Sequence, residues 1–247
     1  MNKAYYELLT KRKSFHSFEN TGDLKLTPED LAGIEEAFSK CKKLIKVDVA
    51  FKIVKASETT MENGNEYAIL LYSEKEDNYL ANIGYIGEQL DLYLNLHGIA
   101  TLWCGMGKPE EKEYQGLDYV IMLGIKKVDP SILYRQDVSE FNRKPIDDIW
   151  QGLHPMEMVR YAPSACNSQP WIIKEKFGNL EVHRYNGSAE GDYSSRVYNY
   201  FNHIDIGIMM CFLEIVLEHE DIEFSRKVYD DCDRLSIEVL NAKYQLY

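Results

Sequence analysis

The chain has 247 residues, which is enough to bury one large or two modest hydrophobic cores. Its 40 acidic and 28 basic residues give a formal net charge of −12 at pH 7. This charge repels duplex nucleic acid and anionic membranes at long range, so we expect neither as a partner. The most apolar stretch, Ile206 to Leu213, is far shorter than the roughly 20 residues that span a bilayer, and the N-terminus carries no apolar signal core.

The cysteines and histidines do not follow the spacing of a metal site or of a redox pair. None of the five cysteines forms a CxxC pair, and the six histidines include no HExxH-like set. An odd number of cysteines in a long chain favours reduced thiols and a cytoplasmic location. We therefore expect no metal and no disulfide framework.

In chain order, the first half begins with a basic segment and a helix start. Thr27 is the expected N-cap, Pro28 the first helical residue, and Asp30 completes a capping-box spacing. Two β-rich runs follow at 49–54 and 67–72. Apolar residues then recur at helical spacing from Ile83 to His97, and a strand is expected at 120–124.

The second half repeats this order. A second helix start is expected at 153–158, strands at 171–173 and 180–183, a long apolar helix around 206–217, and a closing strand at 235–239. Ile83-Gly84 and Ile206-Gly207 match at an offset of 123 residues. Two amphipathic helices of similar length can match by chance, so the helix pair alone leaves duplication and coincidence equally open. The shared order of elements favours duplication.

Two segments have a composition that suits ligand binding. Residues 12–18 (Arg-Lys-Ser-Phe-His-Ser-Phe) combine three basic side chains with hydroxyls, which suits a phosphate, although a basic cluster alone is usually solvated surface. Residues 160–171 (Arg-Tyr-Ala-Pro-Ser-Ala-Cys-Asn-Ser-Gln-Pro-Trp) form a loop stiffened by two prolines, whose Asn167 and Gln169 offer donors and acceptors to a polar heterocycle. The alternative is an ordinary helix-to-strand loop.

These segments resemble the motifs of the nitroreductase family of flavin mononucleotide (FMN) enzymes. The first matches its Arg-x-Ser-x-Arg-x-Phe pattern, with His16 at a position that is usually Arg or Lys. The second matches its Ala-Pro-Ser-x-x-Asn-x-Gln-Pro-Trp loop, and residues 98–105 (Gly-Ile-Ala-Thr-Leu-Trp-Cys-Gly) resemble the Gly-rich turn after its long helix. The proline-bounded loop is the specific motif of the three.

The order of the motifs implies an internal pseudo-dimer. Family members are homodimers with the flavin at the subunit interface, whereas here the proline-bounded loop follows the long helix. This arrangement resembles the fused, pseudo-dimeric branch of the family. It implies an α+β nitroreductase-like fold with two degenerate repeats, at 1–130 and 131–247, each with a mixed or antiparallel sheet flanked by helices and a long central helix. Because the second composite site lacks its motifs, the resemblance implies one FMN per chain.

The resemblance also implies roles for individual residues. Arg12, Lys13 and Ser14 would hold the phosphate, with Lys126 as a further contact, and His16 would lie near the flavin N1 and C2 carbonyl. From the other half, Pro163, Ser164, Ala165, Asn167 and Gln169 would line the ring. Cys104 and Gly105 would present backbone near N5, and Trp103 would shape the pocket unless it is a core residue. The two motif cysteines are more simply read as small buried hydrophobes.

The implied activity is NAD(P)H-dependent reduction of nitroaromatics, quinones or similar acceptors, with FMN carrying the hydride and no catalytic side chain required. A flavin-binding storage or sensor protein would need the same motifs, and a degenerate structural protein would bind no flavin. The chain would act as a monomer or as a further homodimer.

Overall fold

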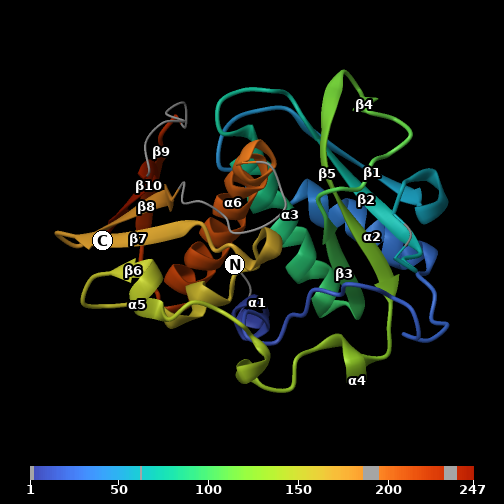
Figure 1. Ribbon diagram of the computed structural model, residues 1–247, viewed down its shortest axis with the longest axis horizontal. Coiled ribbons are helices and arrows are strands. Elements are labelled where there is room, and N and C mark those ends of the chain that lie inside the picture. The colour runs from blue at the N-terminus through green and yellow to red at the C-terminus, as the bar shows by residue number, and fades with distance from the viewer. Residues whose placement is uncertain (1–2, 62, 186–194, 231–237) are drawn as a thin grey trace.

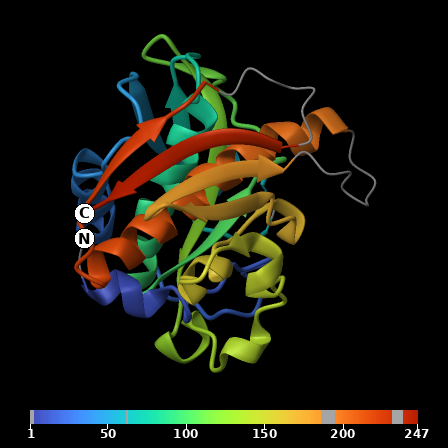
Figure 2. The ribbon, with the colours of Figure 1, turned by 90° about the vertical axis from the view of Figure 1, so that its left-hand side faces the viewer.

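The computed structural model describes residues 3–61, 63–185, 195–230 and 238–247. Two long helices, α3 (Tyr79–Leu96) and α6 (Ser195–His219), pack against each other between two sheets (Figure 1). Seen from the side, the second sheet covers the outer face of α6 (Figure 2). One hydrophobic cluster runs through both sheets and both helices, so the two halves of the chain share a core.

The first sheet has the strand order β1-β2-β5-β3 and is antiparallel. Its strands confirm the expected runs at 49–54, 67–72 and 120–124, which are short apolar segments rich in the β-branched, aromatic and aliphatic residues that fit a sheet. The bounds are β1 Val49–Lys55, β2 Tyr67–Ser73, β3 Ile99–Cys104 and β5 Leu117–Lys127, with the short β4 (Glu113–Tyr114) paired to β5.

The second sheet has the order β6-β7-β8-β10-β9, in which only the β6–β7 pair is parallel. Its bounds are β6 Trp150–Gln151, β7 Trp171–Lys176, β8 Asn179–Tyr185, β9 Phe224–Val228 and β10 Glu238–Leu246. Without the two-residue strands β4 and β6, both sheets follow one pattern: first, second, fourth, third strand in chain order, with the long helix after the second strand. Of the closing strand expected at 235–239, residues 235–237 lie outside the described residues, and 238–239 begin β10.

Glycines allow the two long helices to cross with backbone against backbone. A Cβ atom at Gly84 would lie 2.0 Å from the carbonyl oxygen of Ile204, and one at Gly207 would lie 1.8 Å from that of Ala81. Both pairs are related by the 123-residue offset, because Ala81 corresponds to Ile204 and Gly84 to Gly207. The crossing is therefore reciprocal between the two halves.

The remaining helices are short, except α2 (Pro28–Ser39), where the expected capping box between Thr27 and Asp30 is confirmed. The others are α1 (Lys3–Leu8), α4 (Pro130–Leu133), α5 (Ile146–Ile149) and 3₁₀ turns at Ala56–Glu58, Val138–Glu140, Glu157–Tyr161 and Ala165–Asn167.

The helix start expected at 153–158 is wrong. Leu153 is 87% exposed and lies outside any helix, and only the 3₁₀ turn Glu157–Tyr161 forms in this region. Pro163 limits any helix that starts at Pro155 to about two turns, because a proline disfavours helix in the residue before it and cannot donate within one. This part of the second half therefore does not match α2.

Within the part of the chain that the structure describes, one helical stretch, Asn199–His219, is long and apolar enough to cross a membrane by length and composition. It belongs to α6, and 83% of its apolar window is buried inside the protein. It is therefore the core helix of this fold.

Candidate functional site

A cavity of about 390 Å³ lies where the N-terminal segment, the end of β3, the proline-bounded loop and α6 meet. This volume falls in the range of small-molecule sites. Most of its lining is apolar or aromatic, with a few polar groups. The lining residues are Ser14, His16, Leu102, Trp103, Gly105, Met106, Ile121, Pro163, Ser164, Ala165, Cys166, Phe201, Ile204, Asp205 and Ile208.

The N-terminal segment reaches the cavity because it pairs with β3. Ser14 forms a parallel bridge with Thr101, and the Phe15 N–H donates to the Thr101 carbonyl at 3.0 Å. Phe15 is buried, whereas Ser14 and His16 line the cavity. In an extended segment, alternate side chains point to opposite sides, which places these two together.

The proline-bounded loop is held in a compact shape by its own side chains and by α6. The Gln169 N–H donates to Ser164 Oγ at 2.9 Å, and the Ala165 N–H donates to Asp205 Oδ1 at 3.0 Å. Cys166, Asn167 and Gln169 have φ values of 50°, 56° and 46°, in the left-handed region that few side chains adopt. Such a backbone needs strong local contacts, and these hydrogen bonds supply them.

Seven of the residues expected at the site line this cavity, and they come from both halves of the chain: Ser14, His16, Trp103, Gly105, Pro163, Ser164 and Ala165. Six others do not line it: Arg12, Lys13, Cys104, Lys126, Asn167 and Gln169. Gly105 is covered by Phe201, whose ring would lie 2.6 Å from a Cβ atom at that position.

Asn167 and Gln169 tie the loop to the segment that links the two halves. The Asn167 amide accepts a hydrogen bond from Arg143 and donates one to the Asn142 carbonyl. Gln169, 2% exposed, accepts from the Lys144 N–H at 2.9 Å. The side chains of Asn167 and Gln169 therefore hold the loop against the linking segment.

Arg12 is buried in an ion pair. It is 1% exposed, its Nη2 lies 2.7 Å from Asp91 Oδ2, and it donates to Ser14 Oγ at 3.0 Å. Its Nε lies 3.7 Å from the carboxylate of Glu88. Lys13 and Lys126 instead donate to the carbonyls of Ile132 and Phe18, at 3.5 and 3.3 Å. These cations support the segment that carries Ser14.

Sequence reasoning missed two arginines of the linking segment, Arg135 and Arg143. Both guanidinium groups lie over the Phe141 ring, at 4.3 and 5.5 Å from its centroid. Burial, followed by the positive charges of Arg12 and Arg135, lowers the pKa of Arg143 to about 10. Among the described residues, the buried Nε atoms of Arg12, Arg135 and Arg143 have no hydrogen-bond partner. We call these three the arginine cluster. The repeated arginines around Phe141 were the available sequence signal.

Asp205 is the third residue that sequence reasoning missed. It lies on α6, lines the cavity and is 3% exposed. Burial raises its pKa to about 8, against the lowering effect of its hydrogen bonds from Ala165 and Ser168. A carboxyl group that titrates near neutral pH beside a cavity is a candidate for proton transfer.

Within the described ranges, no three His, Cys, Asp or Glu side chains gather closely enough to hold a metal ion. The cavity suits an aromatic heterocycle better, since Trp103 and Phe201 offer flat apolar surfaces and the loop offers polar backbone. The Nε atoms of the arginine cluster, which have no hydrogen-bond partner among the described residues, suit an anionic tail, because a buried donor needs an acceptor.

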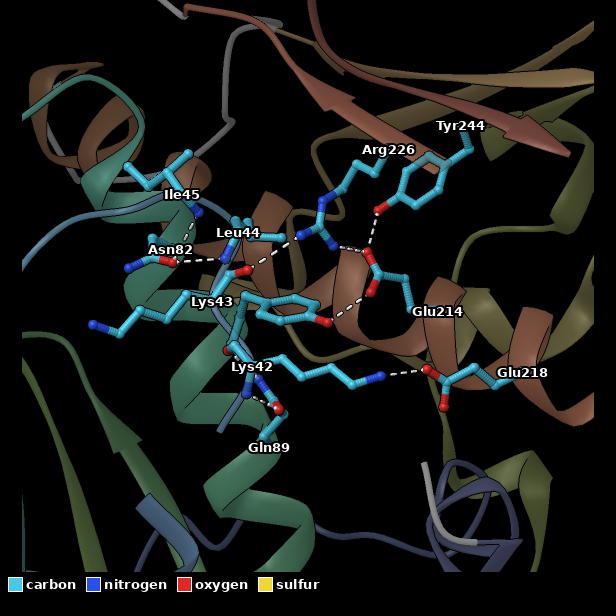
Figure 3. Close-up of polar contacts among 11 residues, drawn as sticks. Lys42, Lys43, Leu44, Ile45, Asn82, Gln89, Glu214, Glu218, Arg226 and Tyr244 are labelled. Carbon is cyan, nitrogen blue, oxygen red and sulfur yellow. Dashed lines mark hydrogen bonds and ion pairs between the residues drawn. The ribbon is translucent and has the colours of Figure 1, made fainter. Parts of the chain in front are cut away.

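The corresponding positions of the other half hold a buried polar network (Figure 3). At the 123-residue offset, Trp103 corresponds to Arg226 and Ile208 to Tyr85. Arg226 and the Tyr85 hydroxyl both bind the carboxylate of Glu214, the latter at 2.6 Å, and Tyr244 donates to it at 2.8 Å. Arg226 also donates to the Lys43 carbonyl at 3.2 Å. In the other half, large side chains thus occupy the positions that correspond to the cavity lining, and they satisfy one another's hydrogen-bonding groups.

The fold and this site define a nitroreductase-like protein. The chain is similar in structure to a putative nitroreductase from Thermotoga maritima MSB8, at 22% identity and a TM-score of 0.63, covering 100% of this chain and 94% of that one. A nitroreductase family protein from Clostridium novyi NT matches at 18% identity over 57% of this chain and 92% of its own, with a TM-score of 0.40. No curated protein matches in sequence.

The family model described as "Putative TM nitroreductase" matches residues 4–216, and the chain belongs to this family. The match includes the N-terminal motif, both long helices and the proline-bounded loop.

Proposed function

We propose that the chain is an FMN-dependent oxidoreductase that takes hydride from NAD(P)H and reduces nitroaromatic, quinone or similar acceptors. One observation carries the proposal: two motif segments about 150 residues apart in the sequence line a single cavity. Family membership supports the redox class. The apolar lining supports a bound aromatic ring, because burial of flat apolar surface stabilises it.

In this proposal, the ring lies among Trp103, Gly105 and the loop residues 163–165. When bound, FMN supplies the centre that accepts and donates hydride. His16 faces the same cavity and would interact with the polar edge of the ring. The side chains fix the orientation of the ring and restrict the access of water.

The phosphate would be held by Ser14 together with Arg135 and Arg143 of the arginine cluster. Arg12 would act mainly through Ser14, since Asp91 already binds its Nη2. Guanidinium groups suit this task because they bind phosphate oxygens in a bidentate manner. This assignment revises the expectation that Arg12 and Lys13 make the main phosphate contacts.

We also propose that the two halves are degenerate copies of one ancestral unit and that only one composite site binds FMN. The common strand order and the reciprocal glycine contacts support the duplication. The buried network around Glu214 supports a single site, because Tyr85 and Arg226 would have to leave satisfied partners to admit a ring.

The test is the absorption spectrum of the purified protein, with extracted flavin quantified per chain. We expect about one FMN per chain, on the single-site argument, and rapid anaerobic loss of the yellow colour with NADH or NADPH. Protein that binds no added FMN would contradict the proposal. Bound flavin that neither nucleotide reduces would instead indicate a storage or sensor protein.

A further inference from the structure

Asp205 has a position in the cavity that its structural contacts do not fully explain. Its Oδ1 accepts the Ala165 N–H and so holds the proline-bounded loop on α6. No described cation pairs with it. The other titratable side chains that line the cavity are His16, from the N-terminal segment, and Cys166, from the loop. The strand residues of the lining carry no charge.

The other half shows that an amide is sufficient to hold such a loop. At the 123-residue offset, Asp205 corresponds to Asn82 of α3. Asn82 Oδ1 accepts the Leu44 N–H at 2.8 Å (Figure 3). Asp205 Oδ1 accepts the Ala165 N–H in the same way. An amide at position 205 should therefore keep the hydrogen bond from the Ala165 N–H, whereas only a carboxyl group at this position can also carry a titratable proton.

The hydrogen bonds around Ser168 favour the protonated form of this carboxyl. Ser168 has one hydroxyl hydrogen but two acceptors within reach, Asn202 Oδ1 at 3.3 Å and Asp205 Oδ2 at 3.4 Å. If Asp205 is protonated, its O–H donates to Ser168 Oγ and the Ser168 hydroxyl donates to Asn202, so each group is satisfied. Burial favours the same neutral form.

We propose that Asp205 is the proton donor of the cavity, giving its proton to the acceptor during reduction. The proposal rests on the proposed function. For a quinone, a hydride whose two electrons come from NAD(P)H reaches one oxygen, and the Asp205 proton reaches the other, giving the hydroquinone. The O–H bond of Asp205 breaks and its electron pair stays on the carboxylate.

The carboxylate that remains can be stabilised where it forms. The Ala165 N–H already donates to Oδ1, and the Ser168 hydroxyl can turn from Asn202 to Oδ2. Water then returns the proton, because the pKa of about 8 favours the acid at neutral pH. Asp205 is thus regenerated after each turnover.

The test compares two acceptors in FMN-loaded Asp205→Asn protein. Menadione needs a proton to form its hydroquinone, whereas ferricyanide takes electrons without protons. We expect kcat with menadione to fall by about 100-fold, the scale of general acid catalysis, and kcat with ferricyanide to stay at the wild-type value. An equal loss with both acceptors, or no loss with menadione, would overturn the proposal. Asp147→Asn, an exposed substitution, is the matched control.

A second readout does not depend on turnover. In the apoprotein, the ¹³C resonance of the Asp205 carboxyl, assigned by its loss in Asp205→Asn, should titrate near pH 8, and a midpoint near 4 would overturn the proposal. Failure to bind FMN, or to be reduced by NAD(P)H, would contradict the proposed function instead. The two failures are therefore distinguishable.

Discussion

At the scale of single residues, the N-terminal arginine motif shows how one pattern can serve two tasks. Arg12 neutralises buried Asp91 and lies near Glu88, whose pKa is raised well above its usual range, chiefly by burial and then by the charge of Asp91. Ser14, two residues later, faces the cavity. The motif therefore anchors its strand from one side and contributes to the site from the other.

This burial leads to a prediction about stability. Arg12→Ala leaves Asp91 as a buried charge without its cation, so we expect a loss of about 3–5 kcal/mol in the free energy of unfolding. Urea denaturation of the apoprotein measures it. Lys11→Ala, at an exposed neighbouring residue, is the control, with a change within about 0.5 kcal/mol. Wild-type stability in Arg12→Ala would show that the ion pair does not hold the segment.

The buried carboxyl of Asp205 predicts a pH dependence of stability. Between about 3.9, the pKa of an unfolded Asp, and about 8 in the folded protein, the folded state holds the extra proton. The stability from this group is complete below the lower value and is lost as the pH rises to the upper one, by up to about 1.4 kcal/mol per unit.

Asp205→Asn removes this group. Between about pH 5 and about pH 7.5, the free energy of unfolding of the variant should therefore fall less than that of the wild type, and the difference between the two falls should be up to about 3 kcal/mol. Urea denaturation at the two pH values measures the difference, with Asp147→Asn again as the control. Parallel curves for wild type and Asp205→Asn would mean that the carboxyl is ionised throughout this range.

At the scale of elements, the crossing of α3 and α6 depends on two glycines. In Gly84→Ala the new methyl group meets a backbone carbonyl of α6, and a backbone cannot rotate away as a side chain can. We expect a loss of at least about 3 kcal/mol of stability.

The matched control is Gly33→Ala in α2, where the new Cβ would meet only the tip of Tyr93, at 2.6 Å. That ring can turn, and alanine favours helix by up to about 1 kcal/mol, so little net change is expected. Thermal and urea denaturation distinguish the two variants. Equal stability of Gly84→Ala and wild type would contradict the close crossing.

Local patterns predicted the elements where one signal was dominant. The capping box of α2 and the short apolar strands β1, β2 and β5 follow directly from their residues. The helix start predicted at 153–158 was wrong, because the likeness of this segment to the start of α2 was given more weight than the prolines that limit a helix there. The long helices were found because their apolar spacing extends over several turns.

The site was predictable where its residues form a contiguous sequence motif. It was not predictable where residues far apart in the sequence come together only in the folded protein. The two motif segments were found, and both reach the cavity. Arg135 and Arg143 approach Arg12 only through the path of the linking segment, which no local pattern encodes. Asp205 lies in an apolar stretch of helix, and its meaning depends on the loop that packs on it.

At the scale of the whole molecule, two sheets of the same strand order enclose two crossed helices, yet their equivalent positions differ in chemistry. Near the cavity stand Trp103 and Ile208; their counterparts, Arg226 and Tyr85, join a saturated polar network with Glu214. The fold thus preserves a near-symmetric framework around unlike interiors. The assignment of separate units at 1–130 and 131–247 stays a prediction, and the shared core binds them together.

This asymmetry has a consequence for how the protein can change. Two identical subunits encoded by one gene receive every substitution twice, so both walls of their shared pockets shift together. Here Trp103 and Phe201 belong to different stretches of a single chain, and each can be exchanged while the other is kept. Libraries of variants at these positions would sample acceptor preference one side chain at a time.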